Sequence, residues 1–473
     1  MKVASLSNPV MSDWLADQGL RLDASPYISG SLEAKKMLER LPNTVPLASL
    51  TTGHNGGIFS GPMFRRVYLT DPEHSVPFLG TKDMMTADLT GLPRLRKSDA
   101  TSATLSYLQV KPGMTLISRS GFNAGRRAYA RPDMGDCWAS EDILKVEPDP
   151  EKIKSGYLYA FLLSQFGESL VRGSVYGSAV KHIEPHHIAG LPVPRFDARL
   201  EERVHRLVER SAKLRARHQA ELVAATKDFF DSNGLSDLNE SRWHQKERDL
   251  GFAVENVSPV SLRASNYGRR AREIKSAFAE VPHRMLGEIC DSGKLGRGLR
   301  TVRVETKEGN GVRLIGQRQA FWNRPEGRWV KDPGDPGIFA TDETIMVTAQ
   351  GLISENGLFG RSIFVTGSWL NYAYTEHFLR IVSGESDVSG AYLFAFFRSE
   401  VAYRLVRSML AGTGPQSVLP SLLRQLPIPL ASPADRARIA ATVRYAYQCR
   451  DRADILEDKA LGLLTTAIKE AAG

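Results

Sequence analysis

The stretch Leu191-Pro-Val-Pro194 returns as Leu426-Pro-Ile-Pro429, 235 residues further along the chain (426 − 191). The match extends upstream, because 13 of the 38 positions in 157–194 are identical in 392–429, whereas about one in fifteen would coincide by chance. An earlier block, Leu22-Asp-Ala-Ser-Pro-Tyr27, returns as Leu262-Arg-Ala-Ser-Asn-Tyr267. The period is far longer than that of solenoid or propeller repeats. The chain therefore contains two copies of one unit, which suits a ligand that presents two sites.

Length and composition narrow the class of protein. With 473 residues, 42% hydrophobic and 24% charged, the chain has the composition of a globular protein of about three domains. Its cysteines, Cys137, Cys290 and Cys449, are scattered and form no Cys-x-x-Cys pair, which is typical of a reducing compartment. The first residues lack the apolar core of a signal peptide, and no stretch approaches the roughly 18 apolar residues of a membrane span. We therefore expect a cytoplasmic protein.

The net charge of +9 favours a polyanionic partner, because lysine and arginine that neutralise phosphates release condensed counterions. Charge alone does not decide the matter, since many basic proteins bind no nucleic acid. Its distribution adds to the argument, because basic residues cluster among turn residues and aromatics in both copies. In the first copy the DNA-binding candidates are Arg65, Arg66, Lys82, Arg119, Arg126, Arg127 and Lys181, near further basic residues at Arg94, Arg96 and Lys97. In the second copy the candidates are Arg297, Arg300, Arg318, Arg324, Arg328, Lys331 and Arg361.

The densest basic run, 317–331, also contains glutamine, asparagine and the aromatic residues Trp322 and Trp329. Arginine can make two hydrogen bonds to the edge of guanine in the major groove, and glutamine or asparagine can do so with adenine. For any single residue in this run, a solvated basic loop is the alternative interpretation. The cluster as a whole favours a nucleic-acid surface.

Each copy divides into a β-rich part and a helical part. Short runs of apolar or alternating residues, bounded by glycine, proline and aspartate, predict strands. In the first copy these runs are 76–79, 114–118 and 142–146, and in the second they are 312–315, 344–348 and 377–382. The loops between them differ strongly between the copies, which favours two recognition surfaces that read different things. Drift of surface loops after the duplication is the alternative.

A long helix is predicted after each Pro-x-Pro. Asp197 is the expected N-cap of the first helix, which we expect to end at about Asp228. Ser432 is the expected N-cap of the second, with Pro433 at its first position, and this helix is expected to reach nearly the end of the chain. Apolar spacings of three and four residues predict an antiparallel coiled coil, and packing of each helix on its own β-rich part is the alternative. The expected seams are Leu200, Val204, Leu207, Ser211, Leu214 and His218 in the first helix and Ile439, Val443, Ala446, Ala453, Leu456, Ala460, Leu463 and Ala467 in the second.

The order and repetition of these motifs resemble the specificity (S) subunit of type I restriction-modification systems, and the resemblance covers essentially the whole chain. The local matches are the Leu-Asp-Ala-Ser-Pro-Tyr block, the strand Val76-Pro-Phe-Leu-Gly-Thr-Lys-Asp83 and the loop Gly412-Thr-Gly-Pro-Gln416. Each motif alone has low specificity, and their repetition before two long helices carries the resemblance. Gln416 of this loop is a further DNA-binding candidate. The first copy departs from the pattern, because its loop reads Gly177-Ser-Ala-Val-Lys-His182.

The resemblance implies an α+β fold. Two similar α/β target-recognition domains, each a β-rich core with short helices, would be joined by two long helices that form an antiparallel coiled coil, giving a pseudo-twofold internal repeat. About thirty helical residues make a rod of about 45 Å, or roughly thirteen base pairs of B-DNA. The expected boundaries are 1–196 for the first recognition domain with an N-terminal extension, 197–230 for the first spacer helix, 231–261 for a connector, 262–431 for the second recognition domain and 432–473 for the second spacer helix.

The resemblance also implies a non-catalytic DNA-binding subunit that reads a bipartite target in double-stranded DNA. Such a chain would hold two modification methyltransferase subunits, and restriction or translocase subunits where restriction accompanies methylation. It would bind no cofactor itself, since S-adenosylmethionine, ATP and magnesium are expected on the partners. The sequence contains neither an Asn-Pro-Pro-Tyr methyltransferase motif nor a GxxxxGK[ST] phosphate loop. The alternatives are a DNA-recognition subunit of a different phage-defence or modification enzyme, and a general scaffold with no nucleic-acid role.

Two other features could indicate chemistry. The run His182-Ile-Glu-Pro-His-His187 contains the His-x-Glu of zinc deaminases, but no Pro-Cys-x-x-Cys follows it and Pro185 interrupts a helical ligand spacing. The second copy reads Ser417-Val-Leu-Pro-Ser-Leu422 there, without histidines. We therefore expect a loop before the terminal strand or helix, with no metal site. Cys137 beside Trp138 is expected to be a small core residue and not a nucleophile.

Overall fold

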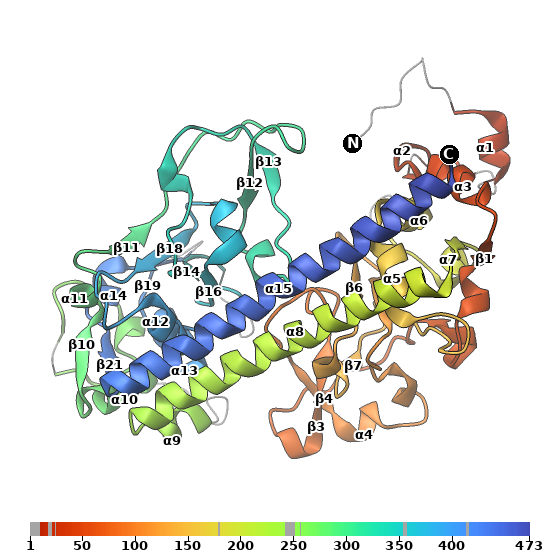
Figure 1. The fold of residues 1–473 in the computed structure, drawn as a ribbon. Helices are drawn as coiled ribbons and strands as arrows, with labels where there is room; N and C mark the ends of the chain where they lie inside the picture. Colours follow the sequence, from red (N-terminus) through yellow and green to blue (C-terminus); the bar gives the residue numbers. More distant parts are fainter. Residues whose placement is uncertain are drawn as a thin grey trace. The chain divides into compact units, whose positions relative to one another are not determined.

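The computed structural model describes residues 10–17, 21–23, 25–177, 180–241, 251–255, 257–352, 357–412 and 416–473 (Figure 1). The chain divides into two compact units. Unit 1 comprises Met1–Ala216 and Arg452–Gly473, and unit 2 comprises Arg217–Asp451. No described helix is both long and apolar enough to cross a membrane. Parts of the motifs and of the expected connector, at 24, 178–179, 242–250, 256 and 413–415, lie outside the described residues.

Unit 1 is built from small sheets covered by helices. An antiparallel sheet has the strand order β2-β8-β5-β6, a second has the order β4-β3-β7 with β3 parallel to β7, and β1 pairs with β9. The strands are β1 Thr44–Pro46, β2 Ile58–Phe59, β3 Ser75–Leu79, β4 Arg94–Arg96, β5 Thr115–Ser118, β6 Arg127–Tyr129, β7 Trp138–Ala139, β8 Ile143–Val146 and β9 Pro192–Pro194. The helices are α1 Ser12–Asp17, α2 Ser25–Ile28, α3 Ser31–Glu39, α4 Lys97–Ala100, α5 Ser155–Leu163, α6 Gln165–Ser174 and α7 Pro185–Ala189.

Unit 2 has sheets of the same kinds. Their strand orders are β11-β18-β14-β16, β13-β12-β17 and β10-β21, together with β15-β20-β19. The strands are β10 His283–Met285, β11 Lys294–Arg297, β12 Val312–Ile315, β13 Arg328–Val330, β14 Thr344–Thr348, β15 Gln350–Gly351, β16 Ser362–Val365, β17 Ala373–Tyr374, β18 Phe378–Val382, β19 Leu410–Ala411, β20 Gln416–Val418 and β21 Pro427–Pro429. The helices are α9 Ser236–Glu240, α10 Arg269–Ala279, α11 Leu286–Ile289, α12 Gly390–Phe397, α13 Glu400–Ser408 and α14 Pro420–Arg424.

The duplication in the sequence is also present in the topology. The order β11-β18-β14-β16 repeats β2-β8-β5-β6, and β13-β12-β17 repeats β4-β3-β7, including the one parallel pair in each. The Pro-x-Pro strands repeat as well. The buried Tyr157 hydroxyl donates to the carbonyl of Pro194 at 2.6 Å, and the Tyr392 hydroxyl donates to that of Pro429 at 2.8 Å. The mixed α and β class predicted from the sequence is therefore confirmed.

The predicted strands agree closely with the observed ones. The runs 76–79, 114–118 and 142–146 correspond to β3, β5 and β8, and the runs 312–315, 344–348 and 377–382 correspond to β12, β14 and β18. Gly125 and Gly360, which match at the 235-residue offset, have φ angles of 85° and 89°. This left-handed conformation is readily adopted only by glycine, which explains why both copies have it at this turn.

The core of each unit forms around a buried helix. All residues of α12 are buried, and α5 is buried from Gly156 to Leu162. Neither helix shows a polar face, because each lies between the four-stranded sheet and the helices outside it. Burying a side chain such as Phe161 or Phe396 contributes about 1.5–3 kcal/mol. These helices therefore fix the frame on which the loops of each unit are carried.

A cation is buried at the same position in the large sheet of each unit. Lys145 is the third residue of β8 and Arg380 is the third residue of β18. The guanidinium of Arg380 donates to the three carbonyls of 337–339 at 2.6–3.0 Å. The ammonium of Lys145 donates to the carbonyl of Ile143 at 3.0 Å, and burial lowers the pKa of Lys145 to about 7. The guanidinium of Arg380 therefore has three carbonyl partners, whereas the ammonium of Lys145 has one.

The long helices are α8 Ala198–Ser232 and α15 Pro433–Ala471. Asp197 accepts from the N–H groups of Arg199 and Leu200, and Ser432 accepts from that of Asp435, so both predicted N-caps are confirmed. The first helix ends at Ser232, a turn beyond the expected Asp228.

Each unit contains a segment of both long helices, and the segments touch within the unit. In unit 1, Ser211 Oγ donates to the carbonyl of Ala453 at 2.9 Å. In unit 2, His218 Nδ1 lies 2.9 Å from the carbonyl of Ala446, and Arg438 pairs with Asp228 at 2.7 Å. Because the numbers rise along α8 while they fall along α15, the segments in unit 2 are antiparallel.

One part of the expected seam in α15 is wrong. The expected seam positions from Ile439 to Ala460 are buried. Leu463 and Ala467 are only half-buried, and Leu464 and Ile468 take their place in the core of unit 1. The buried positions 456, 460, 464 and 468 follow steps of four. This end of the helix packs on its unit's core as well as on α8, and Leu464 and Ile468 face that core. In α8, Leu200 and Leu214 are likewise only half-buried.

Candidate nucleic-acid interface

The sheets β4-β3-β7 of unit 1 and β13-β12-β17 of unit 2 carry exposed cations on or near their strands. In unit 1, a segment at 67–69 extends this sheet beside β4 through a bridge between Tyr68 and Leu95. In unit 2, a segment at 304–306 extends it beside β13 through a bridge between Glu305 and Val330. The sheets place the residues before β3, after β3 and along β4 and β13 at the surface, where several predicted candidates lie.

Three candidates of unit 1 are exposed. Arg65 precedes β3, Lys82 lies in the turn after it, and Lys181 lies in the segment before α7. None of the three makes an ion pair with a residue that the structure describes. Their charges are therefore available to an anionic ligand.

Two other candidates of unit 1 are held by carboxylates. Arg66 contacts Glu141 at 2.5 Å and lies over the ring of Phe78. Arg119 makes two hydrogen bonds with Glu184, the shorter at 2.6 Å, and these raise the pKa of its guanidinium. An arginine whose charge is neutralised by a carboxylate holds a loop in place, and it attracts phosphates less than an unpaired arginine does. Arg126 is half-buried.

The prediction that Arg127 binds DNA does not fit the structure. Its side chain is only 6% exposed, and its guanidinium donates to the carbonyl of Gly125 at 2.7 Å and lies 3.8 Å from Glu168. Arg127 is the first residue of β6, where successive side chains alternate between the two faces of the sheet. All three residues of β6 are buried, so both faces of the strand are covered. A side chain in this position cannot reach a duplex unless the unit rearranges.

The candidates of unit 2 divide in the same way. Arg300, Arg318 and Lys331 are exposed and make no ion pair with a described residue. Arg328 pairs with Glu305 at 3.0 Å, and Arg361 lies between Glu400 and the ring of Tyr403. The remaining three are partly buried: Arg297 in β11, Arg324 before β13, and Gln416 in β20 opposite Gly351.

The tryptophans of the basic run support the frame. Trp322 is 3% exposed and belongs to the interior. Trp329 lies in β13, and the guanidinium carbon of Arg313 lies over its ring, 5.1 Å from the ring centre. An aromatic ring under an arginine holds its guanidinium in place through cation–π attraction. The two tryptophans of the run 317–331 are therefore structural, and Arg318 and Lys331 are its exposed cations that make no ion pair with a described residue.

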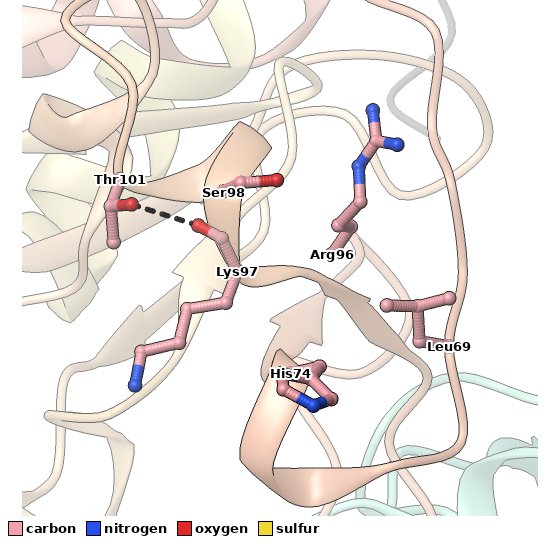
Figure 2. Close-up of a pocket in the computed structure, with 6 residues that line it drawn as sticks. All are labelled: Leu69, His74, Arg96, Lys97, Ser98 and Thr101. Atoms are coloured by element: carbon pink, nitrogen blue, oxygen red, sulfur yellow. Dashed lines mark hydrogen bonds between the residues drawn. The ribbon is translucent and has the colours of Figure 1, made fainter.

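Two clefts contain cations that sequence reasoning did not select together. The cleft in unit 1 has a volume of about 500 Å³ (Figure 2) and is lined by Leu69, His74, Arg96, Lys97, Ser98 and Thr101. The cleft in unit 2 has a volume of about 560 Å³ and is lined by Leu299, Arg300, Thr301, Val302, Val304, Lys331, Asp332, Pro333 and Asp335. The signals in the sequence were the basic run at 94–97 in unit 1 and the candidates Arg300 and Lys331 in unit 2. The cleft in unit 1 could not itself be predicted, because it forms only when β4 meets 67–69.

The other chemical readings find no support among the described residues. No group of three metal-ligating side chains occurs there. Residues Pro185–Ala189 form α7, so the expected loop is in part a short helix, with Pro185 at its first position and Glu184 and His187 closing its N-terminus. Cys137 is buried, as expected, and burial raises the pKa of its thiol to about 12. A thiol that stays protonated at neutral pH is a poor nucleophile.

The sequence matches no protein-family model and no curated protein. Solved structures that are similar to this chain include the S subunit of a type I restriction-modification system from M. genitalium. That match has 13% identity and a TM-score of 0.37 and covers 91% of this chain and 94% of that one. A chain from a structure of complex assembly and conformational transition in the type I R-M system has 13% identity and a TM-score of 0.27, with 90% and 98% covered. The HsdS subunit from Thermoanaerobacter tengcongensis has 12% identity and a TM-score of 0.27, with 91% and 97% covered.

Proposed function

We propose that this chain is the DNA-specificity subunit of a type I restriction-modification complex. The observation that carries the proposal is one topology built twice in one chain, with exposed cations on each copy of the repeated frame. Unit 1 presents Arg65, Lys82 and Lys181, whereas unit 2 presents Arg318 and Lys331. Two such surfaces in one chain would each read one half of a bipartite target in double-stranded DNA.

The long helices support the second part of the proposal. Each is continuous, and each contributes one segment to unit 1 and the other to unit 2. Helices that pair as a coiled coil would act as a spacer that sets the gap between the half-sites. In this role the chain would be a non-catalytic scaffold for two modification methyltransferase subunits, with S-adenosylmethionine bound by those partners and ATP and magnesium by restriction subunits.

Half-site reading is tested with Arg318→Ala and Arg65→Ala. Arg318 is an exposed arginine of unit 2, and Arg65 is an exposed arginine of unit 1. Each variant is expected to lose about 1–3 kcal/mol of discrimination in one half-site only, because a base-reading arginine acts where its unit binds. The measurement is methylation of a library of randomised targets by the complex with its modification subunit. Equal losses in both half-sites for either variant would contradict the assignment.

The spacer is tested by inserting seven residues into both long helices at the unit boundaries, between Ala216 and Arg217 and between Asp451 and Arg452. A heptad keeps the buried face of each helix and adds about 10 Å, so the preferred gap should grow by roughly three base pairs. The same library assay reports the gap. The control carries the same seven residues at the exposed Gly309, which lies outside both long helices, and it should keep the original gap. An unchanged gap in the double insertion would exclude the spacer role.

A further inference from the structure

The clefts in the two units lie at the same place in the repeated frame. In the parallel pairs, Leu79 of β3 lies opposite Ala139, and Ile315 of β12 lies opposite Tyr374. Aligning these pairs makes β3 equivalent to β12 and therefore β4 equivalent to β13. Each cleft lies beyond the end of β4 or β13, although different loops complete it.

One backbone contact identifies the equivalent residues in the two clefts. The N–H of Arg96 donates to the carbonyl of Val67 at 2.9 Å, and the N–H of Lys331 donates to that of Val304 at 2.8 Å. Arg96 and Lys331 therefore occupy the same position, 235 residues apart in the sequence. A cation stands at this position in both copies, even though the loops around it differ.

The cleft in unit 1 contains no carboxylate among its lining residues. Arg96 is partly neutralised by Asp99, which accepts two hydrogen bonds from its guanidinium. Lys97 is exposed and makes no ion pair with a described residue. Figure 2 shows the side chains of Arg96 and Lys97 diverging from neighbouring positions, with the hydroxyl of Thr101 bonded to the Lys97 carbonyl. The cleft offers positive charge and the hydroxyl of Ser98.

The cleft in unit 2 has a mixed charge. Arg300 and Lys331 come from different segments, and neither makes an ion pair with a described residue. The position after Lys331 is Asp332, where unit 1 has Lys97. The carboxylates of Asp332 and Asp335 accept N–H groups of their own turns at 2.9 and 2.7 Å. They reduce the surplus of positive charge without pairing with the cations.

We propose that the two clefts are equivalent contact sites for the phosphates of the DNA backbone, one in each unit. This inference rests on the proposed function and adds the contact that orients each unit on the duplex. Exposed lysine, arginine and hydroxyl groups suit phosphate oxygens, and such contacts set position without reading sequence. A position that stays cationic while the neighbouring loops diverge fits a contact with the invariant part of the ligand. Because Asp332 replaces Lys97, unit 2 makes the weaker contact.

Lys97→Ala and Lys331→Ala test the proposal in the full chain. The affinity for a labelled random-sequence duplex is measured across a series of salt concentrations. Each variant should reduce the slope of log affinity against log salt by about 0.9, and the double variant by about 1.8, because each phosphate contact releases condensed counterions. Asp332→Lys should have the opposite effect, with a steeper slope and tighter binding. Lys213→Ala, which removes an exposed lysine of α8 outside both clefts, should leave the slope unchanged.

The outcomes separate this inference from the function on which it rests. If the unaltered chain binds the duplex with a strong salt dependence and neither cleft variant changes the slope, the clefts are not phosphate sites. If Lys97→Ala alone changes it, the equivalence of the two clefts is wrong. A variant that alters the preferred bases in the methylation library would also contradict a backbone contact. If the unaltered chain shows no salt-dependent binding, the proposed function itself fails. Unchanged thermal unfolding of each variant verifies that these exposed positions do not affect folding.

Discussion

Arg215→Ala is expected to lower the free energy of unfolding of unit 1 by about 3–5 kcal/mol. The guanidinium of Arg215 contacts Asp454 at 2.8 Å and Glu457 at 3.0 Å, and its side chain is 8% exposed. Tyr159 donates to the same Glu457 at 3.2 Å. Truncating the arginine would leave two carboxylates at a largely buried contact without their cation. Removing one member of a buried ionic group costs more than the group contributes as a whole, because the remaining charges stay desolvated.

The measurement is urea unfolding of the full chain together with hydrogen exchange of the α8 and α15 segments in unit 1. The matched control is Arg206→Ala on the same helix, which breaks an exposed pair with Glu202 and should change stability by about 0.5 kcal/mol or less. Replacing the whole group by Arg215→Met, Asp454→Leu and Glu457→Met should restore most of the loss. If Arg215→Ala costs no more than the control, the buried group does not stabilise the helix pairing.

Lys145→Met is expected to stabilise unit 1, and the gain should depend on pH. Burial lowers the pKa of Lys145 to about 7, far below the usual value of about 10.4. Between these values the unfolded chain binds a proton that the folded chain does not, so stability rises with pH across this window. Below pH 7 the lysine is charged in both states and the folded chain bears the full cost of burial. The difference in unfolding free energy between variant and unaltered chain should therefore be largest near pH 6–7, roughly 3–5 kcal/mol, and should shrink toward pH 10.

The equivalent change in unit 2 should have the opposite sign. Arg380 donates to three carbonyls, so Arg380→Met leaves buried acceptors without donors and should cost about 2–4 kcal/mol. Hydrogen exchange of β8 and β18 amides, measured at several pH values, reports each unit separately. A destabilising Lys145→Met, or a gain that does not vary with pH, would show that the ammonium is better satisfied than its one hydrogen bond indicates.

Much of the frame could be predicted because its signals are local. The N-caps at Asp197 and Ser432 follow from side chains that bond their own backbone, and the strands follow from short apolar runs between turn residues. The repeat made these signals more reliable, since each appears twice. The end of the α15 seam was misplaced by one residue because Leu463 and Leu464 are adjacent leucines. Which of them faces the core depends on the surface that the helix packs against. The periodicity of the helix alone cannot predict that surface.

The surface could be predicted less well, because it depends on residues distant in sequence. Glu184 neutralises Arg119 across 65 positions, and no local pattern shows this pairing. Arg126 and Arg127 look alike as a basic pair, yet Arg127 is buried in β6 whereas Arg126, just before the strand, is half-buried. The cleft beside Arg96 forms when β4 adds to 67–69. A basic residue can be identified from the sequence, but its availability to a ligand is a tertiary property.

The Pro-x-Pro sequence has a consequence for the hydrogen bonding of the buried strands β9 and β21. Leu47 donates to the carbonyl of Leu191 and Arg195 donates to that of Asn43, so the odd-numbered residues of β9 face β1. The outward-facing positions are the prolines Pro192 and Pro194, which have no N–H to donate. In β21 the outward positions are likewise Pro427 and Pro429, because Leu426 and Leu430 make the inward bonds. Both strands are buried, and the outward carbonyls of Pro194 and Pro429 accept from the hydroxyls of Tyr157 and Tyr392. The prolines therefore leave no buried N–H without an acceptor at these outward positions.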